Sequence, residues 1–488
     1  MPSSLFSREY LPLAIGAVAL VTLGAFENRA VGTALPTLVR EFDSVGSFGL
    51  ATAAPIAAYV VSLALAGMWA DRSGPVPPLR AGAVTFAVAQ VLVGTAAGMP
   101  QVIGGRLLSG LAEGLIDVGI MVLIARALPE ALRPRMFSLF AAAWVLPSVV
   151  GPFLTGIVTE GIGWRWVFLG ALAVLGPVWV LLRPALRTLP PSEDGPRTAD
   201  APRPGAALPR PGTAPRAGAA SQARSTPPPA NAGRRAVLPW AVIAAAAVFG
   251  LSLAGEHLAA DPAPAVAVVV LGAAGTGLAA VRLLPRGTFR VRRGLPAVVA
   301  QRAFAAAAFA GVGAWLPLLL TLVHGFTATT AGVSLSITGV AWAFGSWLQG
   351  REHGRAPAVV LRAGLAAMTA GLAATTLLTW PTLPPVVGLL GWALAGVGMG
   401  LTSPVLSLLI LAASDRTNQG RNVSAGQLAG SLSTAAALAV SGAAVALTSP
   451  GPATFAGILV AGGVVALAGL LTAGRVVGDR TTTVGTRT

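Results

Sequence analysis

The 488-residue sequence contains no cysteine, which excludes disulfide bonds and thiolate chemistry. It also contains no lysine, so all 33 basic residues are arginines; with the excess of alanine, glycine and proline, this indicates a high-GC coding bias more than a function. Only three histidines occur, His257, His324 and His353, and we expect each in a loop or at a helix end. We therefore expect no metal site and no cofactor.

Charge is scarce as well. Only 10% of the residues are charged, against roughly 25% in an ordinary soluble domain, whereas 55% are hydrophobic. Apolar stretches of about 20 residues recur along the chain, as bilayer-spanning helices require. We predict an all-α membrane protein with fourteen spans, at residues 11–39, 49–70, 79–98, 101–125, 137–159, 166–184, 237–256, 264–284, 296–322, 328–349, 357–379, 384–411, 423–447 and 453–473.

The arginines are distributed unevenly around these spans. With the N-terminus inside, only Arg40 and Arg165 fall at the outer side. The arginines expected at the inner side are Arg72, Arg80, Arg126, Arg133, Arg135, Arg282, Arg286, Arg290, Arg292, Arg293, Arg351, Arg355, Arg362, Arg416 and Arg421. By the positive-inside rule, this predicts a multi-pass protein of the inner (plasma) membrane with both termini in the cytoplasm. The net charge of +16 is then explained by the orientation of the chain in the membrane and by attraction to anionic lipid of the inner leaflet. We therefore expect no nucleic-acid partner.

An internal repeat divides the chain into two halves. Residues 110–115 (GLAEGL) resemble residues 396–401 (GVGMGL), and the same offset aligns Arg135–Ser138 with Arg421–Ser424. Related halves with a site between them are a common transporter architecture. We predict a six-helix bundle over 1–184, a disordered Pro/Ala/Arg-rich cytoplasmic linker over 185–236, an inserted helix pair over 237–284, a second six-helix bundle over 285–474 and a cytoplasmic tail over 475–488.

The fourth span carries three ionisable residues, Arg106, Glu113 and Asp117. At about 100° per residue they fall within about 40° of one another, on the face that also holds Gly110. Charges are costly in lipid, so this face is predicted to line a water-accessible cavity. The repeat places Met399 and Ser403 at the equivalents of the two carboxylates, which favours a coupling site in the N-terminal half alone. A static buried ion pair is the alternative.

The first span contributes Glu27 and Arg29, which lie about 200° apart on a helix and cannot share one narrow cavity. We expect one of them to point into the substrate path and the other to pair with a neighbouring helix. Glu27, Arg29, Arg106, Glu113 and Asp117 together form the predicted proton-coupling set. Arg302, early in the ninth span, is expected to snorkel to the cytoplasmic interface, with contact to an anionic substrate as the alternative.

Polar and aromatic side chains of the C-terminal half are candidates for the substrate path. Gln427 and Ser431 recur at helical spacing in the thirteenth span. Trp315, Trp342 and Trp392 lie deep in their spans and offer aromatic surface to an apolar substrate. Helix packing is the alternative for both sets. Tryptophans at span ends, Trp164 among them, are expected to be interfacial anchors.

Four motifs resemble those of the major facilitator superfamily, specifically its fourteen-span drug:proton antiporter branch. Glu27 precedes Ala34-Leu35-Pro36 by seven residues, and residues 67–74 (GMWADRSG) resemble the signature loop of the superfamily. Residues 106–110 (RLLSG) resemble its proton-coupling motif, with serine in place of the common glutamine. Residues 151–156 (GPFLTG) resemble the exporter motif, with Pro147 and Thr155 in place of two glycines. The resemblance implies two six-helix bundles plus two inserted helices.

The resemblance also implies a set of gating residues: Asp71, Arg72, Gly74, Arg80, Glu130, Gly151, Pro152 and Gly156. Asp71 is expected to cap the N-terminus of the thirteenth span, where backbone N–H groups are unpaired. Arg72 or Arg80 is expected to pair with Glu130 in one access state. Gly151 and Pro152 are expected to allow a bend and a close helix approach.

These observations favour a proton-coupled antiporter that exports hydrophobic or amphipathic small molecules, by multidrug-type efflux with alternating access. Its partners would be the substrate, protons and membrane lipid, and we expect a monomer. The alternatives are export of a lipid or glycolipid of the cell envelope and uptake of a metabolite. We do not expect an enzyme, because the sequence offers no histidine or cysteine constellation, phosphate-binding loop or nucleophile arrangement.

Overall fold

The computed structural model describes residues 5–44, 47–188, 237–257, 262–326, 328–351, 355–448 and 450–477, and within these ranges the regular structure is helical, without strands. The N-terminal half contains α1 (Leu11–Glu41), α2 (Phe48–Ser73), α3 (Val76–Gly94), α4 (Met99–Ala127), α5 (Arg133–Ala143), α6 (Val145–Gly161) and α7 (Arg165–Thr188). Most of the predicted linker and most of the predicted tail lie outside the described residues.

The C-terminal part begins with the predicted inserted pair, α9 (Val237–His257) and α10 (Pro262–Leu283). It continues with α11 (Leu295–Gly313), α12 (Leu316–His324), α13 (Ala328–Arg351), α14 (Pro357–Thr375), α15 (Pro385–Ala412), α16 (Gln419–Thr448) and α17 (Pro452–Thr472). Every predicted span overlaps one of these helices or a broken pair of them.

Two of the predicted spans are broken, and proline explains both breaks. The span predicted at 137–159 is interrupted at Trp144, between α5 and α6, and the span at 296–322 is interrupted between α11 and α12. A proline ring clashes with the carbonyl four residues earlier and removes a helical hydrogen bond. Helix α5 ends at Ala143, four residues before Pro147, and α11 ends at Gly313, four residues before Pro317.

Ten helical segments of the described chain are long and apolar enough to cross a membrane. Helices α9 and α10 contribute shorter apolar stretches, Val237–Leu251 and Ala267–Leu283. The protein is therefore a multi-span helical membrane protein, and the count of fourteen spans stays a prediction.

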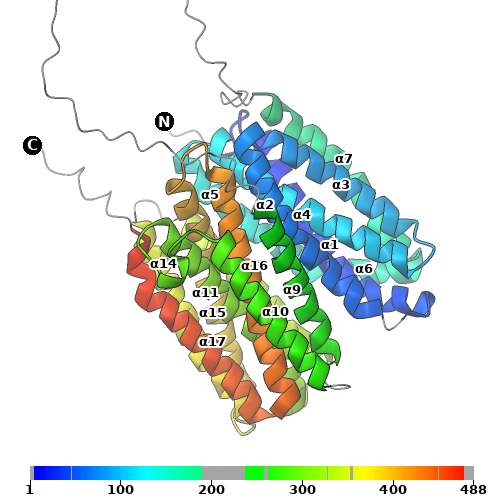
Figure 1. Ribbon diagram of the computed structural model, residues 1–488, viewed down its shortest axis with the longest axis vertical. Coiled ribbons are helices and arrows are strands. Elements are labelled where there is room, and N and C mark those ends of the chain that lie inside the picture. Colours follow the sequence, from blue (N-terminus) through cyan, green and yellow to red (C-terminus); the bar gives the residue numbers. More distant parts are fainter. Residues whose placement is uncertain are drawn as a thin grey trace, which may run out of the picture.

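The two halves repeat the same packing pattern (Figure 1). In the N-terminal half α4 packs against α2 and α3, and α1 packs against α7; in the C-terminal half α15 packs against α13 and α14, and α11 against α17. Glycines allow the closest helix crossings in both halves. A Cβ at Gly110 would lie 2.0 Å from the Pro55 carbonyl oxygen, and a Cβ at Gly400 would lie 2.1 Å from that of Trp342. Small residues let helix backbones approach in this way.

The halves meet along two related seams. Helix α2 of the N-terminal half packs on α16 of the C-terminal half, and α13 of the C-terminal half packs on α5 of the N-terminal half. Helix α9 lies along both α2 and α16, with α10 against α9 and α16, so the inserted pair covers one of these seams (Figure 1). One continuous buried core runs across both halves and includes Leu63, Leu123, Leu361 and Val405.

Candidate functional site

Two of the ionisable residues of α4 contact side chains of helix α1. The Arg106 guanidinium forms an ion pair with the Glu27 carboxylate, and both side chains are at least nine-tenths buried. About two turns further along α4, the Asn28 side chain donates a hydrogen bond to Glu113 Oε1 at 3.0 Å. Glu27 therefore pairs with a neighbouring helix, and the side chain of Arg29 lies outside the described residues.

The second carboxylate of the stripe, Asp117, lies where the two halves meet. The Tyr59 hydroxyl, on α2, donates a hydrogen bond to Asp117 Oδ2 at 2.8 Å. From the other half, the Gln427 side chain on α16 lies beside the same carboxyl group. Gln427 Oε1 in turn accepts a hydrogen bond from Arg302 Nη2, on α11, at 2.6 Å. A continuous polar chain thus runs from one bundle to the other.

Arg302 points inward, so the expectation that it snorkels to the cytoplasmic interface is wrong. Besides Gln427, its guanidinium reaches the Ser403 carbonyl oxygen at 3.4 Å and Ser407 Oγ at 3.5 Å. The physical reason is that these acceptors on α15 and α16, and the carboxylate of Asp117 beyond Gln427, satisfy the guanidinium inside the protein.

The predicted stripe on α4 faces an internal cavity of about 30 Å³ rather than lipid. Glu27, Ser109, Glu113, Asp117 and Trp144 are among the residues that line it. Two polar atoms beside it, Ser109 Oγ and Arg106 Nε, are buried and have no hydrogen-bond partner within the part of the chain that the structure describes. Such groups favour a site that takes up water, a proton or a polar group of a ligand.

Asp71, at the end of α2, contacts the other half. Its carboxylate accepts hydrogen bonds from the backbone N–H groups of Gly420, at 2.6 Å, and Arg421, at 2.9 Å, which belong to the first turn of α16. This is the helix-capping contact expected from the sequence, and it places a negative charge at the positive end of a helix. Nearby, Arg126 Nη2 donates to the Arg416 carbonyl oxygen at 3.1 Å, which adds a second tie between the halves.

Glu130 does not pair with Arg72 or Arg80 in this conformation among the described residues, and the pairing expected in one access state stays a prediction. Glu130 lies in a short turn with 90% of its side chain exposed, and its nearest cation is Arg133, at 3.6 Å. Arg72 and Arg80 are exposed, and neither forms an ion pair with Glu130 among the described residues. Gly74 ends α2 with a φ of +79°, a conformation that favours glycine.

The exporter-like segment is interrupted at Trp144, and the bend expected at Gly151 and Pro152 stays a prediction. Helix α6 runs from Val145 to Gly161 without interruption, so the break lies at Trp144 and not at Gly151 or Pro152. The side chain of Pro152 lies outside what the structure describes. A Cβ added at Gly156 would have no described atom within 4 Å, so no helix approaches closely there.

The three tryptophans predicted for the substrate path differ in their surroundings. Trp392 is 1% exposed and stacks on Phe309, with ring centroids 4.8 Å apart, so it is a core residue and offers no surface to a substrate here. Trp342 meets the same phenylalanine edge-on and is half-buried. Trp315 donates its indole N–H to Ser441 Oγ at 2.7 Å. Ser431, on α16, is half-buried.

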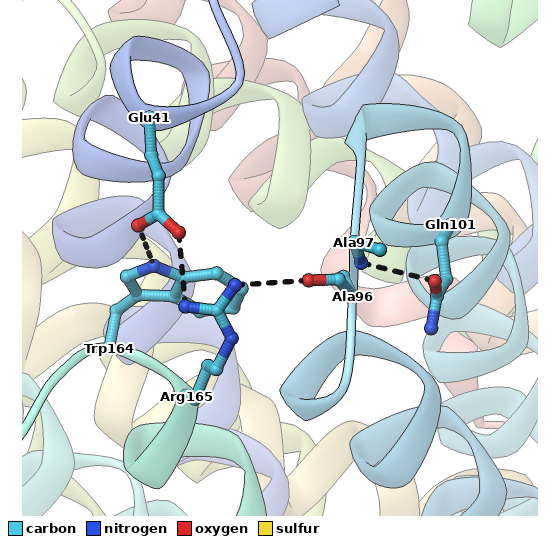
Figure 2. Close-up of polar contacts among 6 residues, drawn as sticks. All are labelled: Glu41, Ala96, Ala97, Gln101, Trp164 and Arg165. Atoms are coloured by element: carbon cyan, nitrogen blue, oxygen red, sulfur yellow. Dashed lines mark hydrogen bonds and ion pairs between the residues drawn. The ribbon is translucent and has the colours of Figure 1, made fainter.

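Trp164 is buried, so it is not an interfacial anchor. It belongs to a cluster of polar contacts that Figure 2 shows. Its indole N–H donates to one oxygen of Glu41, and Arg165 Nη1 donates to the other oxygen at 3.0 Å. Arg165 Nη2 also donates to the Ala96 carbonyl oxygen at 3.1 Å. The cluster joins the end of α1, the start of α7 and the α3–α4 turn.

Sequence reasoning missed Tyr59, Asn28 and the connection of Arg302 to Asp117. Each is a polar residue within an apolar span, which is the signal that selected the α4 stripe. Their partners, however, are tens to hundreds of residues away in sequence, and only the packing of α1, α2, α11 and α16 around α4 brings them together.

A model of the Major Facilitator Superfamily matches residues 17–438. Among curated proteins, the chain is similar to Multidrug resistance protein 3 of Bacillus subtilis, with 29% identity over 165 residues that cover 33% of this chain and 32% of that protein. It is also similar to the Dehydrocurvularin exporter of Alternaria cinerariae, with 28% identity over 198 residues that cover 38% of this chain and 33% of that protein. The chain thus matches about a third of the length of these curated relatives.

Solved structures show the same fold over nearly the whole chain. The human organic anion transporter MFSD10 superposes with a TM-score of 0.63 at 16% identity, over 94% of this chain and 99% of that chain. The proton:xylose symporter XylE superposes with a TM-score of 0.59 at 15% identity, over 95% of each chain.

Proposed function

Because the chain belongs to the Major Facilitator Superfamily, we propose that it exports hydrophobic or amphipathic small molecules in exchange for protons, by alternating access. The chain is a multi-span membrane transporter and not an enzyme. The finer proposal includes proton-coupled antiport, fourteen spans and a plasma-membrane location with both termini in the cytoplasm. Relatives that are named as multidrug resistance and exporter proteins support the outward direction.

The observation that carries the proposal is the position of Asp117 on the seam between the halves. Its carboxylate accepts a hydrogen bond from Tyr59 of one half and lies beside Gln427 of the other, which binds the Arg302 guanidinium. When protonated, it loses its attraction to that guanidinium. Proton binding therefore changes the free energy of contact between the halves, which biases the equilibrium between access states.

Glu113 and Glu27 take different parts in this proposal. Glu113 has an uncharged donor, Asn28, and lines the cavity, so it can gain or lose a proton without leaving a cation unpaired. Glu27 is committed to Arg106 in a buried ion pair. Removing either charge of such a pair leaves the other uncompensated, so we assign the pair to holding α1 against α4.

We assign the contacts of Asp71 and Arg126 to the conformational change of the transport cycle. Both tie the N-terminal half to the loop and first turn that lead into α16. In the proposed orientation these ties lie at the cytoplasmic end, so this conformation is closed toward the cytoplasm. Breaking them is the step that opens the inward-facing state.

The test is dye transport in proteoliposomes with an imposed pH gradient. Ethidium movement is measured for the wild type, for Glu113→Gln and for Asp117→Asn, with Glu160→Gln as a control that removes an exposed carboxylate from α6. We expect the gradient to drive ethidium transport in the wild type and the control but not in the two site variants. Unchanged pH-driven transport in both site variants would remove the proton-coupling proposal.

The same vesicles separate the alternative functions. Accumulation of ethidium on the cytoplasmic side that collapses with the gradient indicates uptake. Transfer of a fluorescent glycolipid between leaflets, without ethidium transport, indicates lipid export. Either result overturns the proposed efflux of small molecules.

A further inference from the structure

A second, larger cavity lies in the N-terminal bundle, away from the seam. It is a groove of about 710 Å³ with α1 as its floor and α6 and α7 as its walls. Helices α6 and α7 each pack along α1 but touch each other little, which leaves the space between them open. On α1 the lining runs from Ala14 to Phe26, a length of about 18 Å at 1.5 Å per residue.

The mouth of the groove opens sideways, where the bilayer would lie. Leu154 on α6 and Trp166 on α7 line the groove and are 44% and 55% exposed. The lining is almost wholly apolar, with valine, leucine and alanine predominating. Only molecules that dissolve in the hydrocarbon region would gain free energy by entering it.

One polar group within the groove lacks a partner. The side chain of Thr155, on α6, lines the groove, is 0% exposed and leaves its hydroxyl without a hydrogen bond among the described residues. A buried hydroxyl without a partner is destabilising, and an acceptor on a ligand would satisfy it. The groove therefore suits an apolar molecule that carries a carbonyl or ether oxygen.

The groove adjoins the cavity that contains the carboxylates. Leu23 lines both cavities, one on each side of α1. At the break between α5 and α6, Trp144 lines the carboxylate cavity, whereas Leu139 and Leu146 on either side of it line the groove. A single layer of side chains at an interrupted helix thus separates the groove from Glu113 and Asp117.

We propose that this groove is the entry site through which the substrate passes from the bilayer to the carboxylate cavity, with Leu23 and Trp144 as the movable partition. The inference rests on the proposed function and names its substrate class: a predominantly apolar molecule, dissolved in the membrane, with a hydrogen-bond acceptor for Thr155. Its volume lies within the roughly 300–1,000 Å³ of small-molecule sites. Continuity with the carboxylate cavity favours a passing substrate over a resident phospholipid.

The absence of native cysteine allows a direct test. Leu154→Cys and Ile157→Cys place single thiols on the same helix at similar exposure, 44% and 53%, but only position 154 lines the groove. Each thiol is labelled with bimane before reconstitution, and quenching by the apolar nitroxide ester TEMPO benzoate is titrated. We expect saturable quenching at 154, relieved by Hoechst 33342, and quenching merely proportional to the membrane concentration of the probe at 157.

Two further variants in the Leu154→Cys background examine the unpartnered hydroxyl. Thr155→Val is expected to raise the half-saturating probe concentration about fivefold, the effect of one lost hydrogen bond, while Thr155→Ser restores it. Proportional quenching at both labelled positions overturns the proposal. So does saturation by a nitroxide-labelled phosphatidylcholine that TEMPO benzoate cannot displace, since the occupant would then be a resident lipid.

Transport provides the second arm. Leu154→Trp fills the groove and is expected to slow pH-driven Hoechst 33342 transport about fivefold or more relative to Ile157→Trp. Equal rates in these two variants overturn the entry route while leaving proton-coupled export intact. If the wild type instead fails to respond to the pH gradient, the proposed function fails, and the quenching titration still decides whether the groove binds an apolar molecule.

Discussion

Asp71 Oδ1 accepts the backbone N–H of Gly420 at 2.6 Å, which joins the last turn of α2 to the first turn of α16. The two residues are 349 positions apart in the chain and belong to different halves. Nothing larger than glycine fits at 420, because a Cβ there would lie 2.4 Å from the Gly67 carbonyl oxygen. A charged cap and a close backbone approach thus coincide at one point of the contact between the halves.

Asp71→Asn should weaken this closure. The amide keeps an acceptor oxygen but loses the charge that favours a helix N-terminus, a difference of about 0.3–1 kcal/mol. Spin labels at two exposed positions, Ser73→Cys and Thr417→Cys, report the separation of the halves by electron paramagnetic resonance. We expect a larger long-distance population in Asp71→Asn than in the parent.

Asp415→Asn is the matched control for that measurement, because it removes an exposed carboxylate from the loop that precedes α16. It should leave the distance distribution unchanged. If Asp71→Asn and Asp415→Asn give the same distribution as the parent, the cap does not govern closure.

The Glu27–Arg106 pair should reveal itself through stability. Glu27→Gln leaves a buried guanidinium without its counter-charge, which costs about 3–5 kcal/mol. The double variant Glu27→Gln/Arg106→Met removes both charges and should recover most of that loss. Thermal unfolding in detergent measures the stability of both variants. Glu130→Gln is the control, because the Glu130 side chain is 90% exposed and its ion pair should contribute about 1 kcal/mol or less. A double variant as unstable as the single one would argue against a structural pair.

Tyr59 should act on transport through Asp117 and not independently of it. Tyr59→Phe removes a hydrogen bond to a charged group, worth about 1.5–3 kcal/mol, so pH-driven ethidium transport should fall about tenfold. In Asp117→Asn the same replacement should have little additional effect, because the two residues share one contact. The chain contains only one other tyrosine, and Tyr10→Phe serves as the control. Additive losses in the double variant would place Tyr59 outside the proton site.

The sequence predicted the parts of the site that depend on local patterns. The α4 stripe follows from helical periodicity, and the Asp71 cap from a motif at the end of an apolar span. The broken helices were less accessible: α5 and α11 end four residues before Pro147 and Pro317, yet α2 and α15 run unbroken through Pro55 and Pro404. Packing against neighbouring helices decides whether a proline interrupts a span, and one chain's sequence does not show that packing.

Side-chain partners across the seam depended on the same missing information. Arg302 was expected to turn toward the cytoplasmic membrane interface, because placing a charged arginine in lipid costs free energy. Inside the protein, Gln427 and Ser407 accept hydrogen bonds from the guanidinium and offset that cost. Trp392 was expected on the substrate path because it lies deep in its span, whereas depth in the membrane does not separate a cavity wall from a core.

Glycine replacements test whether the crossing of α2 and α4 positions the carboxylates of α4 at their cavity. A Cβ at Gly110 would meet three backbone atoms of Pro55, at 2.0, 2.6 and 2.7 Å, and backbone cannot rotate away as a side chain can. Gly110→Ala should therefore push α4 off α2, with a loss of about 1–3 kcal/mol in the free energy of unfolding, and lengthen the contact between Tyr59 and Asp117, which lies seven residues further along α4.

Gly156→Ala meets open space and should be neutral or stabilising by up to about 1 kcal/mol, because alanine is the better helix former. Thermal unfolding in detergent and pH-driven ethidium transport distinguish the two: we expect both to fall for Gly110→Ala and neither for Gly156→Ala. Equal behaviour of the two variants would mean that the α2–α4 crossing does not position the carboxylates.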